Sequence, residues 1–203
     1  MICEFRTYAL RPNTLAEFIK RFGDALPRRE KFSKLAAFWY TEIGPLNQVI
    51  HLWPYENALE RSRIRAAAVK DGCWPPDTGE FIVEMRAEIF DPMPFSPPLN
   101  PSSDGPFFEM CTSTLKPFAV PKMVECWQES LQARTELSPL TGVFASDVGH
   151  VNQWLHIWPY KSLDQRAAVR SKATAERIWP PGDAPVLREE SKILLPAPFS
   201  PIR

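Results

Sequence analysis

The hydrophobic positions of this chain change period several times, from alternation at every second residue to a helical stripe and back. Alternation predicts strands, and an apolar stripe with helical spacing predicts a helix. The first helix begins at a capping box, Thr14 to Glu17, and its stripe consists of Leu15, Phe18, Ile19, Phe22 and Leu26. The first half therefore predicts a strand, a helix, a hairpin of two strands, a helix and a last strand, over residues 4–10, 14–26, 37–43, 46–53, 57–71 and 81–90.

The same pattern returns 105 residues further along the chain. Residues 47–55 and 152–160 are identical at six of nine positions, and Trp74-Pro75-Pro76 returns as Trp179-Pro180-Pro181. The offset also relates charged residues, because Glu4, Arg61 and Arg65 return as Glu109, Arg166 and Arg170. A shared fold needs only a repeated hydrophobic pattern. The return of Asn, His and Tyr therefore indicates a surface or pocket that both halves build.

Each half has the order βαββαβ, the ferredoxin-like arrangement of a four-stranded antiparallel sheet with both helices on one face. The other face needs cover, and packing the two sheets together with the helices outward supplies it. We therefore predict an α+β fold of two tandem units, residues 1–92 and 107–203, joined by a proline-rich linker at residues 93–106. The proline-rich tail, residues 196–203, is expected either to lie along a neighbouring surface or to hang loose.

Composition excludes several classes of function. The chain has 24 Lys and Arg against 24 Asp and Glu, and neither half is basic, so no nucleic-acid partner is expected. No apolar run approaches the length of a membrane span. A strand pattern begins almost at the amino terminus and leaves no room for a targeting peptide, which predicts a cytoplasmic protein.

Cysteine spacing and known catalytic motifs add little. The cysteines form no Cys-x-x-Cys pair and none occupies its repeat-mate's position, which predicts free structural thiols and no metal site: Cys3, Cys73, Cys111 and Cys126. The chain has no glycine-rich phosphate loop and no Gly-x-Ser-x-Gly sequence. Nucleotide binding and standard hydrolase chemistry are therefore disfavoured.

Candidate chemistry lies on the hairpin's second strand in each half. Alternation places the same residue types on one side of each strand: Asn47, His51 and Trp53 in the first, and Asn152, Trp154, His156 and Trp158 in the second. Ile50 and Leu52 suit the side under the helices, so the Asn, His and Trp side chains are expected to face the opposing sheet. They would line a small-molecule pocket between the sheets, with polar anchors among aromatic walls.

Further polar groups of the first half could join His51: Arg6, Tyr8, Tyr40 and Glu42. The second half has Cys111, Ser113, Ala145 and Asp147 in these places and has lost the arginine and both tyrosines. The first half is thus expected to carry the chemistry. His51 would act as a general base that Asn47 orients and that Tyr8, Tyr40 or Glu42 assists. Two structural alternatives stay open. The histidines can be buried and hydrogen-bonded to the sheet, and Arg6 with Glu42 can be an ion pair that holds two strands.

An arginine pair one helical turn apart occurs in each half, Arg61 with Arg65 and Arg166 with Arg170. Each pair could bind an anion. A solvated helix face with Glu56 or Glu60 as ion-pair partners is the favoured interpretation.

Residues 4–12 (Glu-Phe-Arg-Thr-Tyr-Ala-Leu-Arg-Pro) and residues 38–55, with Arg61 and Arg65 following, strongly resemble a NIPSNAP-family domain. The resemblance covers the whole first half and, more loosely, the second. It implies a dimeric α+β-barrel fold, in which two ferredoxin-like units close a barrel between their sheets. The superfamily includes small monooxygenases, isomerases and haem-degrading enzymes, and the last use Asn, His and Trp around the iron. Asn47, His51 and Trp53 are these residue types, so the resemblance makes haem a cofactor to test.

Three functions follow as hypotheses. The first is an enzyme of isomerase, lyase or monooxygenase type that acts on a small hydrophobic or aromatic molecule. The second is a non-catalytic binding or assembly protein, a homo-oligomer for example, with a barrel interior filled by Trp53, Trp154 and Trp158. The third is a haem-binding protein.

Overall fold

The computed structural model describes residues 1–203, and each half has the predicted order of elements. The first half contains β1 (Ile2–Leu10), α1 (Leu15–Arg29), β2 (Ala37–Ile43), β3 (Gln48–Tyr55), α2 (Ala58–Lys70), the 3-10 turn η1 (Gly79–Phe81) and β4 (Ile82–Pro92). The second half contains β5 (Phe107–Leu115), α3 (Val120–Leu137), β6 (Gly142–Val148), β7 (Gln153–Tyr160), α4 (Leu163–Ala175) and β8 (Val186–Pro196).

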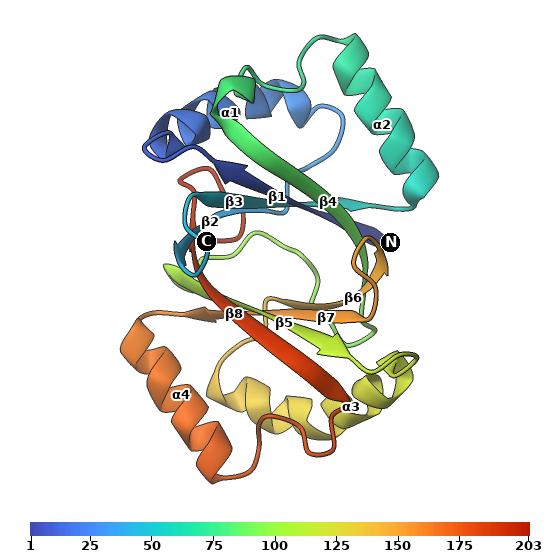
Figure 1. The fold of residues 1–203 in the computed structure, drawn as a ribbon, viewed down its shortest axis with the longest axis vertical. Coiled ribbons are helices and arrows are strands. Elements are labelled where there is room, and N and C mark those ends of the chain that lie inside the picture. The colour runs from blue at the N-terminus through green and yellow to red at the C-terminus, as the bar shows by residue number, and fades with distance from the viewer.

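The eight strands form one closed barrel. The strand order within the halves is β4-β1-β3-β2 and β8-β5-β7-β6, and all pairings are antiparallel. Strand β2 pairs with β8 and β4 pairs with β6, so each half closes the sheet of the other. Figure 1 shows the two sheets facing each other at the centre, with α1 and α2 on one outer side and α3 and α4 on the other. The predicted α+β fold is confirmed.

Apolar side chains fill the barrel interior. Phe5 lies edge-on to both Phe90 and Phe144, with ring centroids 5.2 and 5.1 Å apart. Ile50 and Leu52 belong to this same core, together with Trp39 and Phe108 and further residues of both halves. The interior is closely packed over most of its length, and one smaller cavity of about 90 Å³ is lined by Phe5 and Ile50 together with polar residues such as Glu88 and Lys192.

The predicted orientation of the hairpin strands is therefore wrong. His51 and Trp53 lie outside the barrel, beneath the helices of the first half, and His156 and Trp158 lie in the same position in the second. The barrel is filled, but the residues predicted to fill it, Trp53, Trp154 and Trp158, pack under the helices. The predicted pocket between the sheets therefore cannot hold His51 and His156, and the small cavity that does lie there is lined by neither of them.

Each proline-rich segment packs against the opposite half: the tail lies on the first half and the linker on the second. Phe199 of the tail stacks on Phe22 of α1 with ring centroids 5.8 Å apart, and Phe95 of the linker stacks on Trp127 of α3 at 6.1 Å. A serine hydroxyl anchors each crossing by accepting a backbone N–H bond: Ser200 from Phe38 at 2.9 Å, and Ser96 from Val143 at 3.0 Å. The tail thus lies along a neighbouring surface, and each half completes the helix-side core of the other.

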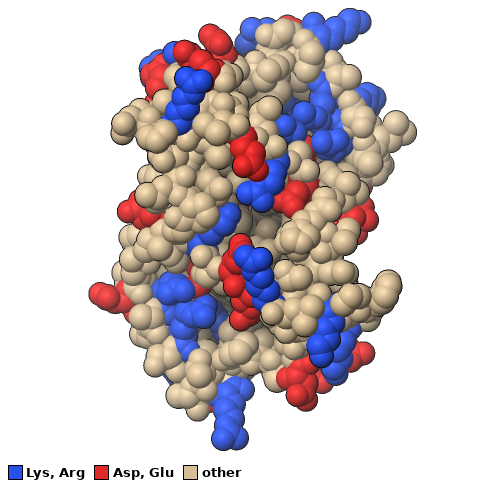
Figure 2. Space-filling view, viewed as in Figure 1, with Lys and Arg blue, Asp and Glu red and all other residues tan.

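Charges of both signs are interspersed over the face that Figure 2 shows. None of the helices combines the length and the apolar character needed to cross a bilayer.

Candidate functional site

Beneath the helices of the first half, His51 is enclosed by aromatic side chains. The indole Nε1 of Trp53 donates a hydrogen bond to His51 Nδ1 at 2.7 Å. Tyr8 stands edge-on to the imidazole with ring centroids 4.9 Å apart, and Phe38 lies parallel to it at 5.7 Å. His51 itself is fully buried. The structure thus brings Tyr8, His51 and Trp53 together, although not on the predicted side of the sheet.

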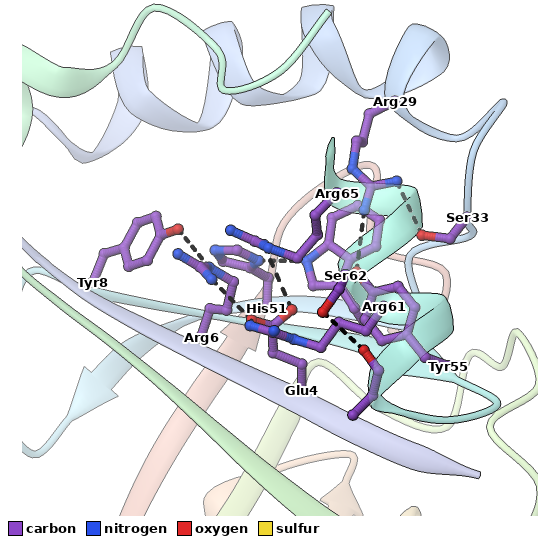
Figure 3. Close-up of polar contacts among 12 residues, drawn as sticks. Glu4, Arg6, Tyr8, Arg29, Ser33, His51, Tyr55, Arg61, Ser62 and Arg65 are labelled. Carbon is purple, nitrogen blue, oxygen red and sulfur yellow. Dashed lines mark hydrogen bonds and ion pairs between the residues drawn. The ribbon is translucent and has the colours of Figure 1, made fainter. Parts of the chain in front are cut away.

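Arg6 fills the space beside this cluster and pairs with Glu4 (Figure 3). Its Nε donates to the Tyr8 hydroxyl at 2.7 Å, and its Nη1 lies 2.9 Å from Glu4 Oε1. Two arginines of α2 converge on the same buried carboxylate, Arg61 at 2.5 Å and Arg65 at 3.6 Å.

Two predicted ion pairs are corrected by this arrangement. Arg6 contacts Glu4 and not Glu42, which is exposed. The arginine pair of α2 turns toward the sheet and neutralises Glu4, so the prediction of a solvated helix face is wrong. A buried carboxylate is stable only when it is paired, and Glu4 supplies the reason for the arginine spacing.

Asn47, Tyr40 and Glu42 are not brought to His51. Asn47 lies in the turn before β3 with φ of 56°, its repeat-mate Asn152 has φ of 59°, and both backbone carbonyls accept strand-end N–H bonds. Asn tolerates this left-handed conformation better than most residues, which explains its return in both halves. His51 is four residues further along the chain, at a rise of roughly 3.3 Å per residue. Tyr40 packs at the margin of the helix-side core.

Each half also buries an arginine that the sequence pattern did not single out. Arg29 and Arg134, on α1 and α3, are 1% and 2% exposed. Each donates to a tyrosine hydroxyl, Tyr55 at 3.1 Å and Tyr160 at 2.9 Å. The guanidinium carbons lie over indole rings, 4.5 Å from the Trp53 centroid and 3.9 Å from the Trp158 centroid. The signal for these residues was their return at the same offset along the chain.

The second half repeats this framework but leaves it hollow. Trp158 Nε1 donates to His156 Nδ1 at 2.7 Å. Glu109 is paired with Arg166 and with Arg170, the latter at 3.0 Å, and accepts a bond from Ser191 Oγ at 2.8 Å. At the positions of Arg6 and Tyr8 stand the smaller residues Cys111 and Ser113. Cys111 lies opposite a histidine as Arg6 does, whereas Ser113 lies opposite Trp154 where Tyr8 lies opposite Val49.

A cavity of about 170 Å³ occupies the vacated space between the sheet and the helices α3 and α4. Its floor is buried and consists of Glu109, His156 and Trp158, and its outer rim on β8 is exposed. The complete lining is Glu109, Cys111, Arg134, His156, Trp158, Arg170, Ala173, Thr174, Trp179, Pro180, Glu189, Glu190 and Ser191. No principal cavity touches Arg6, Tyr8 or His51. The cavity thus lies in the half predicted to be the weakened copy.

Both imidazoles are neutral. Burial lowers the pKa of His156 to about 3 and holds the pKa of His51 well below its usual range, with the charges of nearby arginines acting in the same direction. Because Nδ1 accepts the indole hydrogen bond, the proton resides on Nε2. His51 Nε2 is buried without a partner, whereas His156 lines the cavity. The arrangement suits a hydrogen-bond donor better than a general base.

The pKa values of the buried carboxylates and of the Cys111 thiol are shifted in opposite directions. Burial acts to raise the pKa of Glu109, but the hydrogen bond from Arg166 and the charge of Arg170 outweigh it, so that the pKa is lowered and the group stays ionised. Glu4 follows the same logic with its own arginines. Burial raises the pKa of the Cys111 thiol to about 12, so this thiol is neutral and is not a nucleophile.

Haem does not fit this site. The cavity of about 170 Å³ is smaller than the roughly 300–1,000 Å³ of sites for drug-sized ligands, and a porphyrin is larger than such ligands. The Nδ1 lone pair of each histidine is occupied, and iron at Nε2 would have to displace its proton. No group of three or more His, Cys, Asp or Glu side chains is placed to hold a metal ion.

Fold and site together define a dimeric α+β-barrel architecture, built within one chain, with a helix-covered site on each sheet. A putative monooxygenase from Lactobacillus acidophilus has this architecture, with a TM-score of 0.68 over 97% of this chain and 93% of that chain. Its sequence is 9% identical, so the likeness concerns the fold alone.

The sequence comparisons are more specific. A NIPSNAP family profile matches residues 3–97 and 108–201. The chain is 30% identical to mouse NipSnap homolog 3B and 28% identical to human NipSnap homolog 3A, in each case over 98% of this chain and 85% of the relative. The chain therefore belongs to the NIPSNAP family, as its strand sequences suggested.

Proposed function

We propose that this NIPSNAP protein binds a small molecule in the cavity of its second half. One observation carries the proposal. The two halves share a buried framework, and side chains of the protein fill it in the first half but leave a cavity of about 170 Å³ in the second. Protein interiors are close-packed, so a cavity of this size on a repeated framework is a candidate ligand site.

The size of the cavity limits the ligand. An apolar cavity of about 150 Å³ takes benzene, so this space suits a single ring with one small substituent. Trp158 and Trp179 form two of the walls, with ring centroids 5.9 Å apart and planes at 74°. Such walls favour a planar molecule.

The polar groups at the floor support a ligand with at least one polar substituent. The Nε2–H of His156 forms no hydrogen bond within the protein, and Glu109 keeps one oxygen, Oε2, without a partner. Buried polar groups without partners cost stability, and a bound ligand would offset that cost. Because the imidazole is neutral and donates, the site supports binding through hydrogen bonds rather than proton abstraction by His156. The fold likeness to a monooxygenase supplies no chemistry by itself.

Ligand-observed NMR with small aromatic probes of about six to ten non-hydrogen atoms tests the proposal. Cys111→Arg places the side chain of Arg6 at the equivalent position, which lines the cavity, and is expected to fill it. A matched control adds the same side chain at an exposed position of α2, Leu59→Arg. The wild type and the control are expected to bind at least one probe, and the filled variant to lose it. Probes that still bind the folded, filled variant, or a wild type that binds none of them, would overturn the proposal.

A further inference from the structure

We infer that the ligand of the second-half cavity is a small planar organic cation of the amidinium or guanidinium type. The inference rests on the proposed function and adds the chemical class of the ligand. Arg6 in the first half indicates that class, because its side chain occupies the space that is hollow in the second half.

Strand register shows that Arg6 and Cys111 are equivalent positions. Arg6 lies on β1 opposite His51 of β3 and Ala87 of β4. Cys111 lies on β5 opposite His156 of β7 and Ser191 of β8. The Arg6 guanidinium donates to the buried Glu4 carboxylate and to the Tyr8 hydroxyl. A free guanidinium or amidinium in the second half would find the equivalent carboxylate, Glu109, at the floor of the cavity.

The charges around the equivalent carboxylates, Glu4 and Glu109, differ between the halves in a way that also favours a cationic ligand. Three arginines pair with Glu4 in the first half, namely Arg6, Arg61 and Arg65. The second half keeps only two equivalents at Glu109 and adds a carboxylate at the rim, since Glu189 stands where the first half has Met85. One cation has been lost and one anion gained, which favours a cationic ligand over an anionic one.

The hydrogen-bonding state of the lining groups points the same way. Glu109 is 1% exposed and its Oε2 has no partner. Both lining guanidiniums are occupied, Arg134 by Ser138 and Tyr160 and Arg170 by Glu109 itself. The lining cations thus already hold acceptors, whereas Glu109 is the equivalent of Glu4, which accepts a bond from Arg6 in the first half. Charge-assisted bonds from a planar cation to a carboxylate are the strongest such pairs.

The aromatic wall completes the argument. In the first half Arg29 lies over both Trp53 and Trp74, at 4.5 and 5.7 Å from the ring centroids. In the second half Arg134 lies over Trp158 alone, and Trp179, the equivalent of Trp74, has no cation over its ring. An indole face that lines a cavity is a favourable surface for an organic cation.

Three probes of nearly equal shape and different charge test the inference: benzamidinium, benzamide and benzoate. Their dissociation constants are measured by NMR titration at low salt, for the wild type and for Glu189→Gln, an exposed position. Benzamidinium is expected to bind at least tenfold more tightly than either other probe. Glu189→Gln is expected to weaken benzamidinium several-fold and to leave benzamide unchanged. The filled variant, Cys111→Arg, is expected to bind none of them.

The outcomes separate the two proposals. If benzamide or benzoate binds as tightly as benzamidinium, and the filled variant loses that binding, the cavity is a ligand site but the ligand class is wrong. If benzamidinium binds equally well to the filled variant, both proposals fall. Binding of none of the three probes to the wild type would also contradict the cationic class, because benzamidinium matches the cavity in both size and charge.

Discussion

The two halves of this protein hold the same buried framework and use the central space in opposite ways. In each half a strand glutamate is paired with two helix arginines, and a histidine accepts a bond from a tryptophan. The first half fills the space with Arg6, whereas the second places Cys111 there and opens a cavity. The exchange of Arg6 for Cys111 is thus the main difference between the packed core and the candidate binding site.

The comparison shows which repeated residues are structural. The Glu and Arg residues return because a carboxylate buried under a helix needs cations in either half. The His and Trp residues return because an imidazole buried without charge needs a donor for one ring nitrogen. The residues that differ between the halves, Arg6 and Cys111 above all, decide between packing and binding. The first half therefore serves as the filled reference for the second.

The largest expected effect comes from removing the strand carboxylates. Glu4→Gln leaves Arg6, Arg61 and Arg65 without their partner, and their side chains are 13%, 25% and 32% exposed. Breaking a buried ion pair costs about 3–5 kcal/mol. Glu109→Gln affects Arg166 and Arg170, which are 27% and 51% exposed, so solvent screens more of the loss and roughly 2–3 kcal/mol is expected.

Urea unfolding of the two variants measures this difference, with Glu42→Gln as an exposed control expected to change stability little. Equal costs for Glu4→Gln and Glu109→Gln would show that Arg6 adds nothing to the burial of the first carboxylate. The comparison of the two halves would then lose its electrostatic basis.

The fold was predictable because hydrophobic period and the internal repeat agree in every element. The orientation of β3 was not, because residues on both of its sides are buried, Ile50 at 1% and His51 at 0% exposure. Alternation separates two faces but does not say which one enters the barrel when neither contacts water. The polarity of His51 suggested a pocket between the sheets. His51 lies instead under the helices, where arginine side chains pair with the neighbouring buried carboxylate.

Part of the site could have been predicted from the repeat itself. Glu4, Arg61 and Arg65 all return at one offset, and pairing them would have placed α2 against the helix-side face of β1. The smaller volume of Cys111 at the position of Arg6 also pointed to space in the second half. The cavity itself depends on how neighbouring side chains pack around that space, which a one-dimensional pattern does not contain.

Acid should destabilise the protein through both histidines. The unfolded chain takes a proton on each imidazole below about pH 6.5. The folded chain does not, since burial lowers the pKa of His156 to about 3 and that of His51 well below its usual value. The folded state therefore binds fewer protons, and its stability is lost as the pH falls below about 6.5, by about 1.4 kcal/mol per pH unit for each histidine.

Unfolding free energies of His51→Gln and His156→Gln between pH 7 and pH 4.5 check this slope. Each variant is expected to lack one histidine's contribution to the acid-induced loss of unfolding free energy, which is about 2.7 kcal/mol over two pH units. If only His51→Gln reduces the slope, the cavity lets His156 take up its proton in the folded state, and the two imidazoles are not equivalent.

Filling the cavity is expected to stabilise the protein. Cys111→Arg gives the second half the arginine that packs the first, and cavity filling typically adds about 0.5–2 kcal/mol. Thermal unfolding measures the gain, and the α2 control, Leu59→Arg, should show none. A filled variant less stable than the wild type would mean that the framework of the second half no longer accepts the first half's occupant, and that the two spaces have diverged in shape.

The smallest effect is expected at the turn asparagines, which the structure separates from His51. Asn47 and Asn152 have φ of 56° and 59°, a conformation that glycine adopts without cost. Asn47→Gly and Asn152→Gly should therefore change the unfolding free energy by less than about 0.5 kcal/mol, whereas alanine at either position should cost about 1 kcal/mol. Probe binding in the second half should be the same for Asn152→Gly as for the wild type. A loss of probe binding in Asn152→Gly would show that this asparagine is part of the binding site, and that it occurs in both halves because of ligand contact rather than backbone geometry.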